Sequence, residues 1–170
     1  MARLDGKRIV ITGSSRSLGR EFALACAAEG ASIVINGTNE GALAAVEEEI
    51  RELGVPVRAV PGSVAQTSVC EALVSTCVDE FGGIDVLVNN AGIVRDRTLL
   101  KMTDEDFDEV IAVDLRGPFV CTREAARAMR EQGGGHIIQI TSASGLVGNF
   151  GQTNYAAAKA GLMGIMYTAV

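Results

Sequence analysis

Thr12-Gly-Ser-Ser-Arg-Ser-Leu-Gly19 joins an apolar run, Arg8–Thr12, to a segment with helical patterning that begins near Ser17. A glycine-rich turn alone is weakly informative, because many strand–helix joints contain glycine for tight geometry. Between a strand and a helix, however, such a turn is typical of a nucleotide-phosphate cradle. Gly13 allows a sharp bend, Gly19 allows the helix to approach the strand, and free N–H groups at the helix start attract phosphate.

The rest of the chain alternates short apolar runs with longer helical patterns, which is the signature of βαβ units and a parallel sheet. The runs are almost continuously apolar, as expected when helices cover both faces of a sheet. The expected strands are Arg8–Thr12, Ser32–Asn36, Val57–Val60, Asp85–Asn89 and His136–Thr141. The expected helices are Ser17–Glu29, Glu40–Leu53, Thr67–Phe81 and Thr103–Arg130. The sequence therefore predicts an α/β fold with a doubly wound, Rossmann-like parallel sheet.

Residues at the ends of these segments support the expected helices. Gly30 and Gly54 follow the first two helices and suit left-handed caps. Thr103 offers a hydroxyl to the start of the fourth helix, and acidic residues follow it. Gly117-Pro118 interrupts that helix, so we expect a kink or a break there.

Composition and charge exclude several classes of protein. At 170 residues, with 48% hydrophobic and 21% charged side chains, the chain is expected to form a single domain over 1–170. A net charge of −6 argues against nucleic-acid binding, which needs a clustered basic surface. No stretch reaches the ~18 apolar residues that would cross a membrane. The N-terminus lacks the apolar segment of a signal peptide, so a cytoplasmic protein is predicted.

The cysteines and the single histidine are interpreted as structural. The four cysteines occur in apolar helical contexts without a C-x-x-C pair, so we expect small buried hydrophobes rather than metal ligands. They are Cys26, Cys70, Cys77 and Cys121. His136 opens an apolar strand and is expected to be a strand-edge residue rather than a base. No metal site is predicted.

Late in the chain, Tyr155 and Lys159 are four positions apart, so on a helix they project from one face. A phenol is a weak acid, and a nearby ammonium stabilises its conjugate base. Ser142, thirteen positions before Tyr155, offers a hydroxyl to a reacting oxygen. A Tyr-x-x-x-Lys pair alone is more often a chance surface pair, but the glycine turn upstream favours a catalytic role.

Three motifs together resemble the short-chain dehydrogenase/reductase family. The glycine turn, Asn89-Asn-Ala-Gly92 after the fourth expected strand, and Ser142 followed by Tyr155-x-x-x-Lys159 occur in the family's order and at its separations. The resemblance covers the whole chain and is strongest to the 3-oxoacyl-[acyl-carrier-protein] reductases. The stretches that carry it there are Asn89–Asp96, Met102–Glu105 and Gly148–Leu162.

The resemblance implies an NADP(H)-dependent ketoreductase that reduces a 3-oxoacyl thioester or a similar ketone. Tyr155 would be the acid/base catalyst, Lys159 would stabilise its phenolate and hold the nicotinamide ribose, and Ser142 would stabilise the substrate oxygen. The residues that would line the cofactor are Gly13, Ser15, Arg16, Leu18, Gly19, Thr38, Val64, Asn90, Ala91 and Gly92, together with Tyr155 and Lys159. Two alternatives stay open: an alcohol, sugar or steroid dehydrogenase with the same site, and a catalytically impaired nucleotide-binding fragment.

Three residues depart from the family pattern. Ser17 stands where the family has its middle glycine, so its side chain is expected to loosen phosphate binding unless its hydroxyl donates. Ser63 replaces an acidic or amide residue near the adenine, which is a milder loss. Asp114 replaces an asparagine that completes a water relay to the lysine, and an aspartate lacks the amide donor. An ionised Asp114 would pair with Lys159 and weaken its field on Tyr155, which predicts reduced activity.

The end of the second strand decides between the two nicotinamide cofactors. An NAD-selective site usually has a carboxylate there, whereas this chain has Asn36-Gly-Thr38. Arg16 and Thr38 offer the positive charge and the hydroxyl that a 2′-phosphate needs, so NADP is favoured over NAD. Arg16 could instead be a solvated loop arginine. Glu40, the acid nearby, is expected to cap the next helix.

The resemblance also implies a strand order of 3-2-1-4-5, with two further strands beyond the fifth. We therefore expect the last two strands and the substrate lid to be missing after Val170, which leaves the fifth strand as an exposed edge. Either the sequence is a shortened form of a full enzyme, or the fragment is a weak nucleotide binder. Family members associate through the long helix after strand four and the helix of Tyr155, so a homodimer or homotetramer is expected.

A carrier-protein substrate would need basic docking residues, because carrier proteins are acidic. The turn before the fifth strand, Gln132-Gly-Gly-Gly135, offers none. Arg95, Arg97 and Lys101 could serve instead or could be only a solvated loop.

Overall fold

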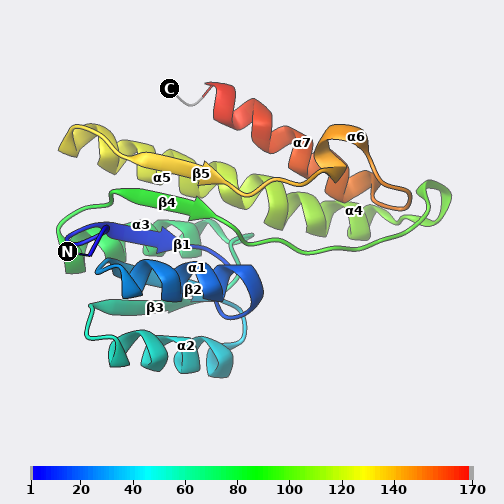
Figure 1. Cartoon of the computed structure of the whole chain (residues 1–170). Helices are drawn as coiled ribbons and strands as arrows, with labels where there is room; N and C mark the ends of the chain where they lie inside the picture. The colour runs from blue at the N-terminus through cyan, green and yellow to red at the C-terminus, as the bar shows by residue number, and fades with distance from the viewer. Residues whose placement is uncertain (1, 169–170) are drawn as a thin grey trace.

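The computed structural model describes residues 2–168 and contains one parallel sheet with the strand order β3-β2-β1-β4-β5 (Figure 1). The strands are β1 (Arg8–Ile11), β2 (Ser32–Gly37), β3 (Val57–Pro61), β4 (Val86–Asn89) and β5 (His136–Gln139). The predicted fold class and strand positions are confirmed, with ends that differ by one or two residues. β5 ends at Gln139 rather than Thr141, because its partner β4 ends at Asn89, directly opposite.

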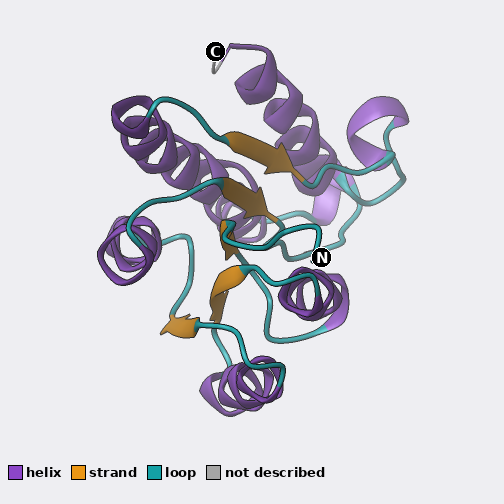
Figure 2. Ribbon diagram, turned by 60° about the vertical axis from the view of Figure 1, so that its left-hand side comes forward, coloured by secondary structure: helices purple, strands orange, loops and turns teal. Residues whose placement is uncertain are grey.

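Helices lie on both faces of the twisted sheet (Figure 2). They are α1 (Ser17–Ala28), α2 (Glu40–Glu52), α3 (Thr67–Phe81), α4 (Asp104–Ile111), α5 (Gly117–Gln132), α6 (Ser144–Val147) and α7 (Thr153–Thr168). A 3₁₀ turn, η1 (Leu99–Lys101), and a π-helical turn, η2 (Ala112–Arg116), complete the elements. Between residues 2 and 168, no helix is both long and apolar enough to span a bilayer.

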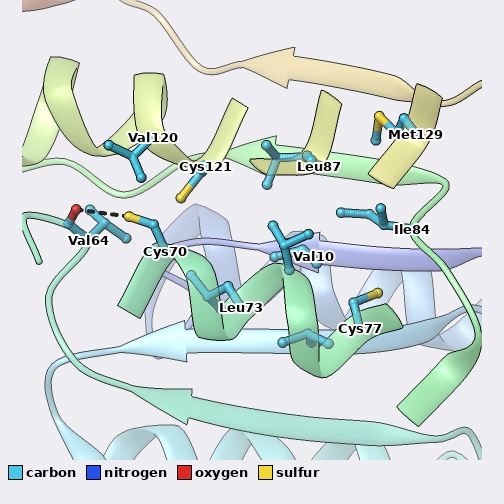
Figure 3. Packing of buried hydrophobic residues seen from close by; sticks show 13 residues of the cluster. Val10, Val64, Cys70, Leu73, Cys77, Ile84, Leu87, Val120, Cys121 and Met129 are labelled. Atoms are coloured by element: carbon cyan, nitrogen blue, oxygen red, sulfur yellow. Dashed lines mark hydrogen bonds between the residues drawn. The ribbon is translucent and has the colours of Figure 1, made fainter. Parts of the chain in front are cut away.

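Both faces of the sheet are buried at β1, β2 and β4, which explains their continuously apolar sequences, whereas Ile138 of the edge strand β5 is 46% exposed, as expected for that strand. Val10 and Leu87 pack against Leu73 of α3 in the cluster between the sheet and α3 and α5 (Figure 3). Ile9 and Ile33 belong to the cluster on the opposite face, beneath α1 and α2. Successive residues of a strand point to opposite faces, so each face needs its own apolar set. Burial of each such side chain contributes about 1.5–3 kcal/mol to stability.

Three helix termini have the caps that the sequence predicts. Gly30 and Gly54 follow α1 and α2 with φ angles of +89° and +79°, in the left-handed region that favours glycine. At the start of α4, the Thr103 hydroxyl accepts a hydrogen bond from the Asp106 N–H at 3.1 Å. Both expectations are confirmed.

The cap predicted for α2 is wrong. Asn39, not Glu40, caps this helix, because its side chain accepts a hydrogen bond from the Ala42 N–H at 2.9 Å. Asn39 has extended backbone, from which a short side chain reaches back to the first free amides. Glu40 lies inside the first turn.

The predicted helix Thr103–Arg130 consists of α4, η2 and α5 rather than one regular helix. The irregular turn precedes Gly117-Pro118, one turn earlier than expected. Pro118 has no N–H to donate to the Asp114 carbonyl, so the preceding turn adopts the wider π pattern. Gly117 allows close packing there, because a Cβ would lie 2.9 Å from the Val64 carbonyl oxygen.

The cysteines follow their prediction with one exception. Cys70, Cys77 and Cys121 are buried, whereas Cys26 is only half-buried at the margin of the core beneath α1 and α2. Burial raises the pKa of the Cys77 thiol to about 12, so this thiol stays protonated at neutral pH. His136 is exposed at the start of the edge strand β5, as predicted.

Candidate active site

A cleft of about 640 Å³ opens beyond the carboxyl ends of β1, β2 and β4. In parallel α/β sheets, ligands bind at this edge, where the strand order reverses. All ten residues predicted to line a cofactor outside α7 lie on its walls. They are Gly13, Ser15, Arg16, Leu18, Gly19, Thr38, Val64, Asn90, Ala91 and Gly92. The fold therefore brings these residues together, and their roles stay predictions.

The glycine turn is packed too tightly for larger residues. Gly13 has a φ angle of +64°, and a Cβ there would lie 2.7 Å from the Ala91 Cα atom. A Cβ on Gly19 would collide with the Gly13 carbonyl oxygen and the Asn90 side chain. The Asn90 amide closes the turn by donating hydrogen bonds to the carbonyls of Thr12 and Gly13 at 3.0 and 3.1 Å. The result is an open cradle at the start of α1, which fits a phosphate-bearing ligand.

Two polar side chains that shape this cradle were not predicted as site residues. The Thr12 hydroxyl accepts hydrogen bonds from the N–H groups of Asn90 and Ala91, both at 3.0 Å. The Asn36 amide donates to the carbonyls of Val60 and Gly62, both at 3.0 Å. Both are buried polar residues at the end of an apolar run, and this placement in the sequence could have identified them as site residues.

Ser17, which stands at the family's middle glycine position, has a strained backbone conformation. Its φ angle is +50°, and within residues 2–168 it is the one residue other than glycine with positive φ. The turn thus keeps a left-handed conformation that costs a non-glycine residue roughly 1–2 kcal/mol. Its exposed side chain lines the cleft.

The β2 end of the cleft carries no free negative charge among the lining residues. Gly37 has no room for a side chain, because a Cβ would lie 2.6 Å from the Ser15 hydroxyl oxygen. Arg16 is exposed on the cleft wall and forms no ion pair within the part of the chain that the structure describes. Glu109, the one acid on the described walls, is held by two hydrogen bonds from Arg95 at 2.7 and 2.8 Å.

Three of the four residues predicted to take part in catalysis, all except Asp114, line a second cavity of about 440 Å³. Ser142 enters it from the segment after β5, and Tyr155 and Lys159 enter from α7. This cavity shares part of its wall with the larger cleft, including Asn90 and Gly92. A dinucleotide in the cleft would therefore extend toward the three side chains.

Hydrogen bonds prepare two of these groups for a reacting oxygen. The Ser142 hydroxyl accepts a hydrogen bond from the Ser144 N–H at 3.2 Å, which leaves its own proton free to donate. The Lys159 ammonium donates to the Ile140 carbonyl at 3.2 Å and lies 5.4 Å from the centre of the Tyr155 ring. The amine thus supplies positive charge beside the phenol.

Asp114 reaches the same amine from the π-helical turn. Its side chain is fully buried, and its Oδ2 atom lies 3.2 Å from the Lys159 Nζ atom. Its Oδ1 atom accepts a hydrogen bond from the Ile93 N–H at 2.8 Å. Burial raises the pKa of Asp114, and the Lys159 charge and the Ile93 amide oppose that rise only in part. Gly92 makes room for the carboxylate, because a Cβ would lie 2.7 Å from Oδ2.

Comparison with known proteins agrees with this geometry. The sequence profile of short chain dehydrogenases matches residues 7–169. The chain is similar to the 3-oxoacyl-[acyl-carrier-protein] reductase of Synechocystis sp., at 44% identity over 99% of this chain and 68% of that protein. It is also similar to the peroxisomal multifunctional enzyme type 2 of Mus musculus, at 45% identity over 98% of this chain and 23% of that enzyme.

A solved structure shares the fold closely. The crystal structure of a short chain dehydrogenase from Mycobacterium avium superposes with a TM-score of 0.92 at 41% identity. The match covers 98% of this chain and 62% of that one. The chain thus spans about two thirds of the length of the bacterial proteins and about a quarter of the mouse enzyme.

Proposed function

Because the chain belongs to the short chain dehydrogenase family of oxidoreductases, we propose that it is an NADP(H)-dependent ketoreductase for a 3-oxoacyl thioester or a similar ketone. One observation carries the proposal. The cleft with the glycine turn shares wall residues, Asn90 and Gly92 among them, with the cavity in which Ser142, Tyr155 and Lys159 meet. The similarity to a 3-oxoacyl reductase supports the substrate class.

The cofactor would lie along the cleft, held mainly by backbone groups. Gly13 and Gly19 let the turn pack closely against Ala91 and Asn90, and the uncapped start of α1 presents N–H groups to the pyrophosphate. Arg16 and Thr38, both exposed on the cleft wall, would bind the 2′-phosphate. The chemistry that the bound nicotinamide supplies is hydride transfer.

The side chains of the second cavity would handle the proton. Tyr155 donates its hydroxyl proton to the oxygen of the reduced carbonyl, and the Lys159 ammonium stabilises the phenolate that remains. Ser142 donates a hydrogen bond to the same oxygen as negative charge develops on it. Asp114 offsets part of the Lys159 charge, because the two groups form a buried ion pair. We therefore propose a slow ketoreductase.

The loop after Gly92 gives little support for docking of an acidic carrier protein. Arg95 is paired with Glu109, and Arg97 lies 3.7 Å from Asp106, so that of the three expected docking residues only the exposed Lys101 has no ion pair within residues 2–168. Paired guanidinium groups offer less attraction to an acidic partner than free ones do. We accordingly propose that the thioester is recognised at the catalytic cavity itself.

A nucleotide-binding protein with little turnover is the second candidate, and the Asp114–Lys159 pair favours it. Fluorescence titration with NADPH and NADH, followed by turnover of an acetoacetyl thioester, separates the two. We expect NADPH to bind about tenfold more tightly than NADH. We also expect Tyr155→Phe to keep that affinity while kcat falls at least about 100-fold. Binding without turnover would favour the second candidate, and no binding would contradict both.

We also propose that the chain forms a homodimer or homotetramer through α4, α5 and α7. Phe107 on α4 and Phe119 on α5 expose 37% and 47% of their surfaces. Aromatic side chains of this size are enriched in protein interfaces. Light scattering of the purified chain and of Phe119→Ser tests the proposal, and a wild-type monomer would contradict it. The cytoplasmic location stays a prediction.

A further inference from the structure

The residue before Tyr155 joins three separate segments. Asn154 is completely buried, and its Nδ2 atom donates hydrogen bonds to the carbonyls of Arg95 at 3.1 Å and Asp106 at 3.0 Å. Its Oδ1 atom accepts a hydrogen bond from the Tyr155 N–H at 2.8 Å. One side chain therefore ties the loop after Gly92, the first turn of α4 and the start of α7 together.

These bonds use both donors and one of the two acceptor positions of the buried amide. Tyr155 lies in the first turn of α7, where backbone N–H groups have no acceptor inside the helix. Asn154 supplies that acceptor, and two main-chain carbonyls satisfy its own N–H groups. A buried amide whose two N–H groups and oxygen are all bonded fixes its neighbours strongly, because each lost bond would leave an unpaired polar group.

A second amide, two residues earlier, ties the same loop to the serine side of the cavity. The Gln152 Nε2 atom donates to an Asp96 carboxylate oxygen at 3.1 Å. Its Oε1 atom accepts from the Ser144 hydroxyl at 2.9 Å. Ser144 in turn donates its N–H to the Ser142 hydroxyl oxygen. Beside these contacts, the Arg97 N–H donates to the Gly151 carbonyl at 2.9 Å.

We propose that Asn154 and Gln152 are positioning residues, a two-amide clamp that fixes Tyr155 and Ser142 in one register against the loop from Gly92 to Arg97. The proposal rests on the proposed function, because it assigns the clamp to the same reaction. A misplacement of about 1 Å in a catalytic group can cost about 100-fold in rate. The clamp acts on the backbone of Tyr155, so it sets the place of the phenol without touching the substrate.

The first test separates positioning from cofactor binding. Asn154→Asp keeps an acceptor for the Tyr155 N–H but loses both donors, so we expect kcat to fall about 10- to 100-fold. The KM for NADPH should stay within about twofold of the wild-type value, because Asn154 does not line the cleft. Gln152→Glu should cost less, because this side chain is only half-buried and water can replace its lost bonds.

A matched control and a milder variant accompany this test. Gln66→Glu makes the same change from amide to carboxylate at an exposed residue outside both cavities and should leave kcat unchanged. Asn154→Ser keeps one donor and one acceptor, so its kcat should lie between those of the wild type and Asn154→Asp. Wild-type kcat in Asn154→Asp, or a rise in KM that accounts for the whole loss, would overturn the proposal.

Hydrogen exchange tests the clamp without turnover. In Asn154→Ser, we expect the Tyr155 amide and the amides of residues 95–98 to exchange at least about tenfold faster, while α2 stays unchanged. Unchanged exchange at these amides would overturn the clamp even if the chain is active. If the wild type turns over no thioester but these amides exchange faster in Asn154→Ser, the result would support the clamp and contradict the proposed function.

Discussion

Two ion pairs lie at opposite ends of the strands, and the pKa of the aspartate is lowered in one pair and raised in the other. At the amino edge, Arg8 at the start of β1 binds the half-buried carboxylate of Asp85 with side-chain hydrogen bonds at 2.7 and 3.0 Å. These bonds hold the pKa of Asp85 below its usual range. At the carboxyl edge, Asp114 and Lys159 are almost completely buried, and burial raises the pKa of Asp114.

The difference separates a pair that stabilises the fold from a pair that lies next to the candidate site. Asp85 keeps contact with water and gains three hydrogen bonds from Arg8, including one from its backbone N–H. Asp114 loses its hydration and gains only the Ile93 N–H and the Lys159 ammonium. The cost of desolvation therefore exceeds the attraction of these two groups for the carboxylate, and the pKa of Asp114 rises. A perturbed buried acid beside a cavity is typical of a functional site. Variants of Lys159, Asp85 and Asp114 test this comparison, and a variant of Ser17 gives an uncharged contrast.

The largest effect is expected for Lys159→Met. Loss of the ammonium removes the positive charge beside Tyr155 and should lower kcat by at least about 100-fold. It also leaves Asp114 buried without its counter-charge, which should cost about 3–5 kcal/mol of unfolding free energy in urea. Adding Asp114→Asn should recover most of that stability. A double variant no more stable than Lys159→Met would show that the two groups are not coupled.

Asp85→Asn should destabilise the protein by about 1.5–3 kcal/mol at neutral pH, because a charge-assisted hydrogen bond is lost. The direction in which this stabilisation changes with pH follows from the lowered pKa of Asp85. This stability is present above the unfolded aspartate pKa of about 3.9 and disappears as the pH falls through the folded pKa. Urea unfolding at several pH values should therefore bring variant and wild type together at low pH. A difference independent of pH would exclude the ion pair as its cause.

Asp114→Asn should raise kcat by up to about tenfold, the size of one interaction of ~1.4 kcal/mol. The amide no longer offsets the Lys159 charge, yet it keeps an acceptor for the Ile93 N–H. Turnover of an acetoacetyl thioester is the measurement. An unchanged or lower kcat would remove the argument that Asp114 slows the enzyme.

Ser17→Gly changes the cradle without changing any charge. Glycine adopts a φ of +50° without strain, so the unfolding free energy should rise by about 1 kcal/mol at every pH. NADPH should bind a few-fold more tightly, because the backbone can approach the phosphate. Calorimetry and titration measure the two effects. Weaker binding would instead indicate that the serine hydroxyl holds the ligand.

The sequence predicted the sheet and the walls of the cleft well, because both depend on local patterns. Continuous apolar runs identified the strands, and the residues near Gly13 and Asn90 follow directly from strand ends. Contacts between distant segments were harder to predict. The Asn154 side chain donates hydrogen bonds to residues 59 and 48 positions away, and the sequence around Asn154 does not indicate those partners. The pairing of Asp114 with Lys159 was anticipated only through the family resemblance.

The π-helical turn has a consequence for how the site tolerates change in length. Deleting one residue of Ala112–Arg116 other than Asp114 would let α4 and α5 merge into one regular helix, which advances about 100° per residue. Such a deletion would turn the carboxylate of Asp114 away from Lys159, even with every chemical group intact. Spacing along the backbone, as much as composition, thus determines whether Asp114 reaches Lys159.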